Sequence, residues 1–243
     1  MKFVDLFAGI GGFHAAATAA GGPTMECVAW CENDPTCQQL YSTAFSRPSL
    51  LVPDVQQIAS SRHDSVDLPD FDLLLGGFPC QPFSNVGKRE GLADARGGLF
   101  FDIIRILKTY KPSLFVLENV QKLSTLDKGG VLSKMHRELQ SCGYSVNVWD
   151  LVASSYGVPQ QRRRLFLVGH RRGINNAQKL IPPPKPVSAD CWKFPTAWHL
   201  LEQKMDPVHI IPRGTRATVL RKNPKWMGDL QISRFILHDT LTL

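Results

Sequence analysis

The chain has 243 residues, of which 43% are hydrophobic and 20% are charged. This composition excludes the fibrous and disordered classes and suffices for one sizeable core, and no uncharged apolar run is long enough to predict a membrane span. The net charge of +7 is uneven, because residues 1–159 hold 13 Lys and Arg against 16 Asp and Glu, whereas residues 160–243 hold 15 against 5. The basic second part indicates contact with a polyanion, although a solvated basic surface explains the charge equally well.

Strand-like and helix-like segments alternate from the N-terminus onward. Strands are predicted at residues 2–7, 26–31, 50–55, 71–77 and 113–120, and helices at residues 9–22, 35–45, 99–110 and 131–143. Two late strands, residues 144–154 and 163–171, are close enough in sequence to pair as a hairpin. This order predicts an α/β fold with a doubly wound, mostly parallel sheet and an antiparallel late strand.

The composition changes after about residue 174, where proline-rich and mixed polar segments replace the alternation. We therefore expect a catalytic domain over residues 1–173 and a linker with an incomplete second domain over residues 174–243. The N-terminus enters the first strand without a basic leader, and the six cysteines lack paired metal-ligand spacings. These features predict a reduced, cytoplasmic protein without a metal site.

A glycine-rich loop follows the first predicted strand. In DLFAGIGGF, residues 5–13, the glycines permit a tight turn and a close approach of the backbone to a ligand. Glu32, at the end of the second strand, is placed to accept hydrogen bonds from a ribose. The spacing matches neither a phosphate-binding loop nor a complete dinucleotide fingerprint. The loop predicts a nucleoside-containing cofactor, and glycines needed only for tight packing are the alternative.

The cysteine of GGFPCQPFS, residues 76–84, is a second candidate site. Buried free cysteines are usually inert, and this is our interpretation of the other five. Cys80 differs because glycine and proline residues around it predict a stiff turn after a buried strand, where open α/β sheets bind their ligands. A nucleophile held in such a turn does not lose entropy in searching for its target.

Two further motifs bring charged side chains to the ends of later strands. Glu118 ends the predicted strand LFVLENV, so we expect it near Cys80 as a general acid, with a simple strand-end cap as the alternative. In QQRRRLFLVG, residues 160–169, Arg162 and Arg164 share one face and could hold a carboxylate, a phosphate or a base edge. Taken alone, such a charge run is usually a solvated sheet edge.

Taken in order, FAGIGGF, GGFPCQPFS, ENV and QQRRR closely resemble the motifs of the cytosine-5 DNA methyltransferase family. DARGGLFFDIIRIL, residues 94–107, resembles the family's loop-and-helix segment, and the resemblance covers residues 3–170 almost continuously. It implies a Rossmann-like methyltransferase fold, S-adenosylmethionine as cofactor, double-stranded DNA as partner and a place in restriction–modification. A nicotinamide dehydrogenase, which the glycines alone would suggest, is disfavoured by PCQPFS and ENV.

The resemblance also implies roles for single residues. The implied cofactor-binding residues are Phe7, Ile10, Gly12, Glu32, Asn33, Asp54, Val55, Pro79 and Leu99. Among them Glu32 corresponds to the carboxylate at the ribose hydroxyls, and Asn33 stands where many members have a larger side chain against the adenine.

The implied catalytic residues are Cys80, Glu118, Arg162 and Arg164. Cys80 corresponds to the nucleophile that attacks carbon 6 of a cytosine turned out of the duplex. Glu118 would bind ring nitrogen 3 and the exocyclic amine, and Arg164, with Arg162 beside it, would contact the base.

Family members usually continue into a target-recognition domain, of which residues 174–243 would be a linker and the incomplete start. Two further family motifs that normally follow this domain are not found in this sequence. Three interpretations follow: a methyltransferase completed by a second polypeptide, a truncated product that binds cofactor or DNA but turns over poorly, and a nonenzymatic regulatory partner. Cys80, Glu118 and both arginines argue against the third, because a scaffold does not need them. RNA is a minor alternative substrate.

Overall fold

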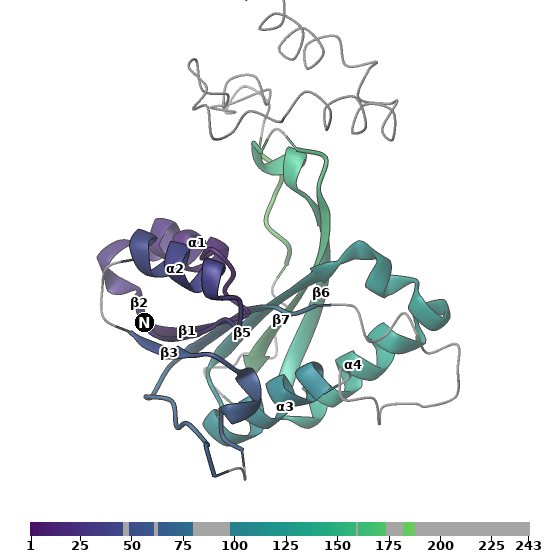
Figure 1. Cartoon of the computed structure of the whole chain (residues 1–243). Coiled ribbons are helices and arrows are strands. Elements are labelled where there is room, and N and C mark those ends of the chain that lie inside the picture. The colour runs from purple at the N-terminus through teal and green to yellow at the C-terminus, as the bar shows by residue number, and fades with distance from the viewer. Residues whose placement is uncertain (46–48, 61–62, 80–97, 159, 174–181, 188–243) are drawn as a thin grey trace, which may run out of the picture. The chain divides into compact units, whose positions relative to one another are not determined.

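The computed structural model describes residues 1–45, 49–60, 63–79, 98–158, 160–173 and 182–187 (Figure 1). Its centre is a seven-stranded sheet in the order β3-β2-β1-β4-β5-β7-β6. The strands are β1 (Lys2–Leu6), β2 (Glu26–Cys31), β3 (Leu50–Val52), β4 (Leu73–Gly77), β5 (Leu114–Val120), β6 (Tyr144–Val152) and β7 (Arg163–Arg171). The first five run parallel, while β7 pairs antiparallel with both β5 and β6. The predicted doubly wound sheet with an antiparallel late hairpin is confirmed.

In the part of the chain that the structure describes, four α-helices cover the two faces of the sheet. They are α1 (Gly12–Gly21), α2 (Pro35–Ala44), α3 (Gly98–Tyr110) and α4 (Gly130–Ser141). Short 3-10 turns lie in the connections between these elements: η1 (Gly22–Thr24), η2 (Val55–Gln57), η3 (Gln121–Ser124), η4 (Leu126–Gly129) and η5 (Ala153–Tyr156). Helices α1 and α2 lie on one face of the sheet, and α3 and α4 lie on the other (Figure 1).

The start of α1 differs from the sequence prediction, which began this helix at residue 9. Gly9 and Gly11 have φ angles of 54° and 92°, in the left-handed region that glycine adopts without a steric cost. The helix therefore begins at Gly12, and the residues before it form a loop after β1.

The core lies on both faces because successive side chains of a strand point in opposite directions. Val4, Leu6 and Leu74 pack on the α3–α4 side in the larger cluster. Phe3 and Leu75 pack with α1 on the other side. Since the order of the strands reverses between β1 and β4, the crevice at their carboxyl ends is the expected ligand site of such a sheet.

Among the helices that the structure describes, none has the length and apolar character needed to cross a membrane.

Candidate active site

A pocket of about 280 Å³ opens at the carboxyl ends of the parallel strands. The described residues that line it are Phe7, Cys31, Glu32, Asn33, Pro53, Asp54, Val55, Gly77, Pro79 and Leu99. Seven of the nine residues expected around the cofactor are in this set. Ile10, which is 65% exposed, and Gly12 are not. The pocket thus brings together segments that are up to 92 residues apart, since Phe7 and Leu99 both line it.

Glu32 connects two loops at the edge of this pocket. Its Oε2 accepts a hydrogen bond from the N–H of Gly9 at 2.8 Å. Its Oε1 accepts from the N–H groups of Asn33 and Asp34 at 2.8 and 2.9 Å. A carboxylate has about four acceptor positions, so these three bonds leave about one on Oε2 for a ligand hydroxyl.

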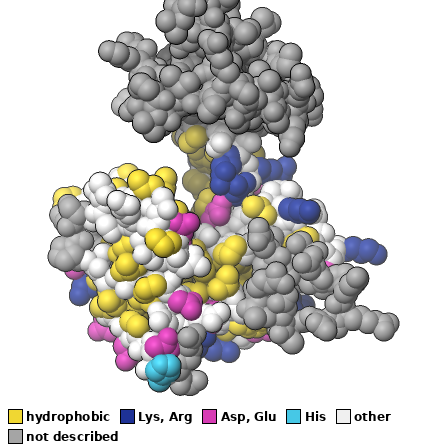
Figure 2. Space-filling model, viewed as in Figure 1, with side chains coloured by type: hydrophobic (Ala, Val, Ile, Leu, Met, Phe, Trp, Pro, Cys, Tyr) yellow, Lys and Arg dark blue, Asp and Glu magenta, His cyan; other side chains and the backbone are white. Residues whose placement is uncertain are grey.

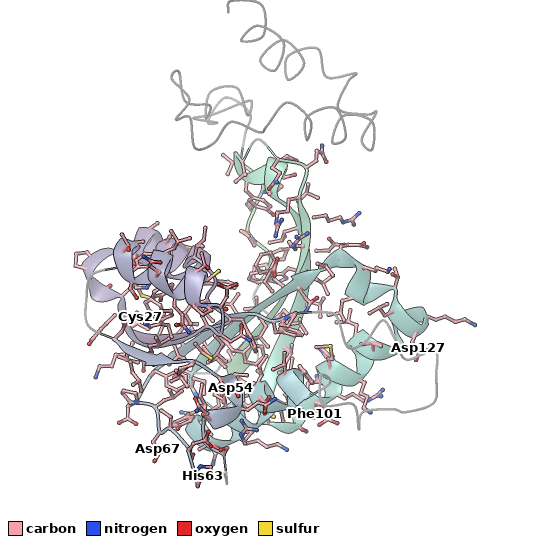
Figure 3. The ribbon with its side chains drawn as sticks, in the orientation of Figure 1. Cys27, Asp54, His63, Asp67, Phe101 and Asp127 are labelled. Atoms are coloured by element: carbon pink, nitrogen blue, oxygen red, sulfur yellow. The ribbon has the colours of Figure 1, made fainter. Side chains whose placement is uncertain are left out.

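The turn after β3 forms the next part of the wall. Asp54 caps η2, because its Oδ1 accepts from the N–H of Gln56 at 2.9 Å. Figure 3 shows Asp54 beside the sheet on the side where α3 lies. Val55 is buried in the larger core cluster, so the turn is attached to the protein interior at the point where it reaches the pocket.

The end of β4 is held by a buried side chain of β5. Asn119, which is 1% exposed, donates from Nδ2 to the carbonyl oxygen of Phe78 at 2.9 Å, and its Oδ1 accepts from the N–H of Val120 at 2.8 Å. Pro79 follows directly and lines the pocket. The predicted nucleophile Cys80 lies outside the described residues, so its role stays a prediction.

Glu118 lies beside the end of β4, as the converging strand ends predict. It pairs with Gly77 in the sheet register, and its Oε2 is the nearest atom, at 3.6 Å, to the position that a Cβ on Gly77 would occupy. Its Oε1 lies 2.7 Å from Nε of Arg164 on β7. The end of β4 thus lies beside a carboxylate that is already paired with a guanidinium.

The three arginines of the late motif have different surroundings. Arg164 pairs with Glu118, whereas Arg163 makes a two-point ion pair with Asp150 on β6, with both distances 2.8 Å. Arg162 precedes β7 and is exposed. Figure 2 shows Lys and Arg side chains near acidic ones on the visible face. The alternation of a strand thus sends two adjacent guanidiniums to two different carboxylates.

The two cysteines of β2, of which only Cys31 lines the pocket, are poor nucleophiles. Burial raises the pKa of Cys27 to about 11 and that of Cys31 to about 12. Both thiols therefore stay protonated near neutral pH, and a thiolate is the reactive form of cysteine. This agrees with the interpretation of these two cysteines as structural.

Sequence reasoning missed three lining residues and two residues that support the pocket. Cys31, Pro53 and Gly77 line it, while Asn119 and Arg105 bond to backbone groups around it. The signal for both was their position at a strand end, since Pro53 directly follows β3 and Gly77 is the last residue of β4. Asn119 and Arg105 act across 41 and 47 residues, and no local pattern indicates such bonds.

The family model described as C-5 cytosine-specific DNA methylase matches residues 1–226. The chain belongs to the C-5 cytosine-specific DNA methylase family.

Relatives within this family are bacterial type II methyltransferases. M.BanI of Aneurinibacillus aneurinilyticus is 42% identical over 198 residues, which are 80% of this chain and 43% of that protein. M.NlaX of Neisseria lactamica is 44% identical over 69% of this chain and 51% of its own length. M.HhaI of Haemophilus parahaemolyticus is 37% identical over 76% and 53%. The chain spans about half the length of the curated relatives it matches.

Solved structures of methyltransferases have the same fold. A DNA modification methyltransferase encoded within an E. coli prophage matches with a TM-score of 0.59 and 26% identity, over 76% of this chain and 53% of that one. A DNMT2 mutant of Spodoptera frugiperda matches with a TM-score of 0.64 and 23% identity, over 87% and 62%. The second likeness shows the fold alone. The Rossmann-like methyltransferase fold expected for this DNA methylase family member is confirmed.

Proposed function

We propose that this chain carries the catalytic part of a DNA (cytosine-5)-methyltransferase that uses S-adenosylmethionine. The observation that carries the proposal is one crevice in which the pocket around Glu32, Asp54 and Pro79 adjoins the Glu118–Arg164 pair. Gly77 joins the two parts, because it lines the pocket and pairs with Glu118 in the sheet. A cofactor and a second reactant could therefore meet at the end of β4.

The residues of the pocket fit S-adenosylmethionine. Glu32 retains an acceptor position for a ribose hydroxyl, and the Asp54–Val55 turn and Leu99 offer a polar edge and apolar surfaces for a purine. When bound, this cofactor supplies an electrophilic methyl group. Phe7 has a φ of 55°, unusual for a residue with a side chain, and such strain is typical of ligand sites.

The proposed chemistry begins at Cys80. Its thiolate would form a bond to carbon 6 of a cytosine turned out of the duplex, which moves electron density to carbon 5. Carbon 5 could then take the methyl group that the cofactor supplies, with S-adenosylhomocysteine as the leaving group. Glu118 holds ring nitrogen 3 and the exocyclic amine as charge develops there, and Arg164 holds Glu118 in place. Arg162 would contact the DNA beside it. Loss of the proton from carbon 5 to a base or water restores the double bond and releases Cys80.

The proposed partner is double-stranded DNA, in the bacterial cytoplasm at the nucleoid. The excess of basic residues after position 159 supports this, as does the description of the relatives as type II methyltransferases. We propose the boundary near residue 173 as the end of the catalytic domain, since β7 ends at Arg171.

Covalent trapping tests the proposal. The purified chain is incubated with S-adenosylmethionine and duplex DNA that carries 5-fluorocytosine in many sequence contexts, and peptide mass spectrometry searches for an adduct. We expect an adduct on Cys80, because fluorine cannot leave carbon 5 as a proton does. Cys80→Ser should abolish the adduct and retain cofactor binding, whereas Cys142→Ser, a matched change at the end of α4, should retain both. An adduct on another residue would contradict the assignment of Cys80.

A second candidate function is that of a subunit which binds cofactor or DNA and needs a second polypeptide for turnover. This chain matches about half of the curated relatives' length, and the unmatched half of those relatives is the part that a second polypeptide would supply. The two candidates differ in the same experiment: the subunit would bind cofactor without forming an adduct until the C-terminal half of a relative is added as a separate chain.

A further inference from the structure

One side chain of α3 forms hydrogen bonds to the η2 turn, and this turn lines the pocket together with α3. Arg105 donates from Nε to the carbonyl oxygen of Ile58 at 3.0 Å. Its Nη2 donates to the carbonyl oxygens of Val55 and Gln56 at 3.3 and 3.4 Å. A single guanidinium thus contacts three backbone carbonyls in and directly after η2, and all three lie 47 to 50 residues earlier in the chain.

Asp102, three residues earlier on α3, orients this guanidinium. Its Oδ1 accepts from Nη1 of Arg105, and the Asp102 side chain is 9% exposed against 32% for Arg105. A guanidinium has five N–H donors in a rigid plane, so holding Nη1 also sets the directions of Nε and Nη2. The carboxylate therefore aims the other donors at the turn.

The same helix reaches the pocket directly. Leu99, in the first turn of α3, lines one side, and Asp54 and Val55 line another. Arg105 joins the two sides, because it belongs to the helix of Leu99 and bonds to the turn that carries Val55. The link adds hydrogen bonds to apolar packing, since Val55 and several residues of α3 belong to the same core cluster.

We propose that Arg105 is a positioning residue for the adenosine part of the cofactor, acting through the Asp54–Val55 turn. The inference rests on the proposed function, in which this pocket binds S-adenosylmethionine. Without the guanidinium, these three carbonyl oxygens lose the hydrogen bonds that connect them to α3, while that of Val55 keeps the N–H of Ile58 as a donor. The turn is then held to α3 by apolar packing, which leaves its backbone less firmly placed. The pocket then spends part of its time with its walls at the wrong separation, and affinity falls in proportion.

The test compares two arginines that hold backbone carbonyls at opposite ends of the sheet. Arg105→Met keeps an unbranched apolar stem and removes the donors. Arg171→Met is the matched control, because Nη1 of Arg171 donates to the carbonyl oxygen of Lys111 at 2.6 Å, at the end of the sheet away from the pocket. Calorimetry with S-adenosylhomocysteine on the full chain should show about tenfold weaker binding for Arg105→Met and a change within about twofold for Arg171→Met.

Base discrimination separates positioning from a general loss of stability. S-inosylhomocysteine differs from S-adenosylhomocysteine at the purine ring. The affinity for S-adenosylhomocysteine divided by that for S-inosylhomocysteine therefore measures how well the turn holds the base. Arg105→Met should lower this ratio, and Arg105→Lys, which keeps a charged donor, should restore part of it. If the methionine variant does not fold, the affinity ratio of the lysine variant is compared with that of the natural chain instead. An unchanged ratio in a folded variant overturns the proposal.

Hydrogen exchange tests the link between Arg105 and the η2 turn without any cofactor. The N–H groups of Gln57 and Ile58 bond to the carbonyl oxygens of Asp54 and Val55 at 3.0 and 3.2 Å, and their exchange should accelerate in Arg105→Met but not in Arg171→Met. Equal protection in both overturns the link. If the natural chain does not bind S-adenosylhomocysteine, the proposed function fails instead, and the exchange result still decides whether Arg105 holds the turn.

Discussion

Nε of Arg164 on β7 lies 2.7 Å from Oε1 of Glu118 on β5, across an antiparallel strand pair. Arg164 stands opposite Val120, two residues beyond Glu118, so the contact is diagonal, within the reach of long side chains. The antiparallel hairpin strand β7 therefore supplies the cation for a carboxylate that ends a parallel strand. The pair positions the carboxylate that we assign to the target base.

Glu118→Gln should lower methyl transfer strongly and leave the fold intact. The amide keeps the size of the side chain and can still accept a hydrogen bond from Arg164, but it cannot protonate the base or form an ion pair. We therefore expect a loss of about 10²- to 10⁴-fold in rate. Both side chains are about one-quarter exposed, so the change in stability should stay near 1 kcal/mol. Transfer of a labelled methyl group to DNA measures the rate, and S-adenosylhomocysteine affinity is the control. An undiminished rate would contradict the role of Glu118.

Glu32→Ala should weaken cofactor binding by about 1.5–3 kcal/mol, the contribution expected of hydrogen bonds to a charged group. The loss has two sources, because Glu32 offers an acceptor to the ligand and also ties Gly9 to β2. Calorimetry with S-adenosylhomocysteine measures it. Glu26→Ala, an exposed glutamate at the other end of the same strand, is the matched control and should bind normally. Equal affinities for the two variants would move the cofactor to another site.

Gly11→Ala should destabilise the chain, whereas Gly12→Ala should be tolerated. A Cβ on Gly11 would overlap with the ring of Phe45, and the φ of 92° disfavours any side chain. We expect a cost of about 2–4 kcal/mol for Gly11→Ala, because Phe45 also stacks on His14 at 3.8 Å and moves with difficulty. Gly12 has free space, so its change should stay within about 0.5 kcal/mol. Urea unfolding compares them, and similar midpoints would refute the packing argument.

Asp5→Asn should remove part of the pH dependence of folding. Burial, with the nearby carboxylate of Glu32 adding to it, raises the pKa of Asp5 from 3.8 to about 8. Between these values the unfolded chain loses the proton while the folded chain keeps it, so stability falls as pH rises towards 8 and levels off above it. The asparagine variant lacks this loss, which is about 1.4 kcal/mol for each pH unit.

Urea unfolding at pH 5 and pH 8 checks this prediction. The difference in unfolding free energy between Asp5→Asn and the natural chain should grow by about 4 kcal/mol over this interval, in favour of the variant. Subtracting the unfolding free energy of the natural chain from that of the variant at each pH cancels the contributions of the other titrating groups. Parallel pH curves would show that Asp5 ionises in the folded protein as it does in the unfolded chain.

The sequence by itself determined the order of strands and helices in this protein and most of the residues at its pocket. Alternating apolar runs predicted the parallel strands, the short spacing of the late strands predicted the hairpin, and the ordered motifs identified the family. These features depend on local periodicity or on residue identity at fixed spacing, which a single chain displays directly.

The tertiary structure decided which residues hold the site together. Arg105 and Asn119 look like ordinary helix and strand residues in the sequence, yet each bonds to backbone carbonyls more than 40 residues away. Glu118 likewise acquires Arg164 through the pairing of β5 with β7. Such contacts arise because the carboxyl ends of the parallel strands and the amino end of β7 lie at one edge of the sheet. No local pattern records which side chains then reach across it.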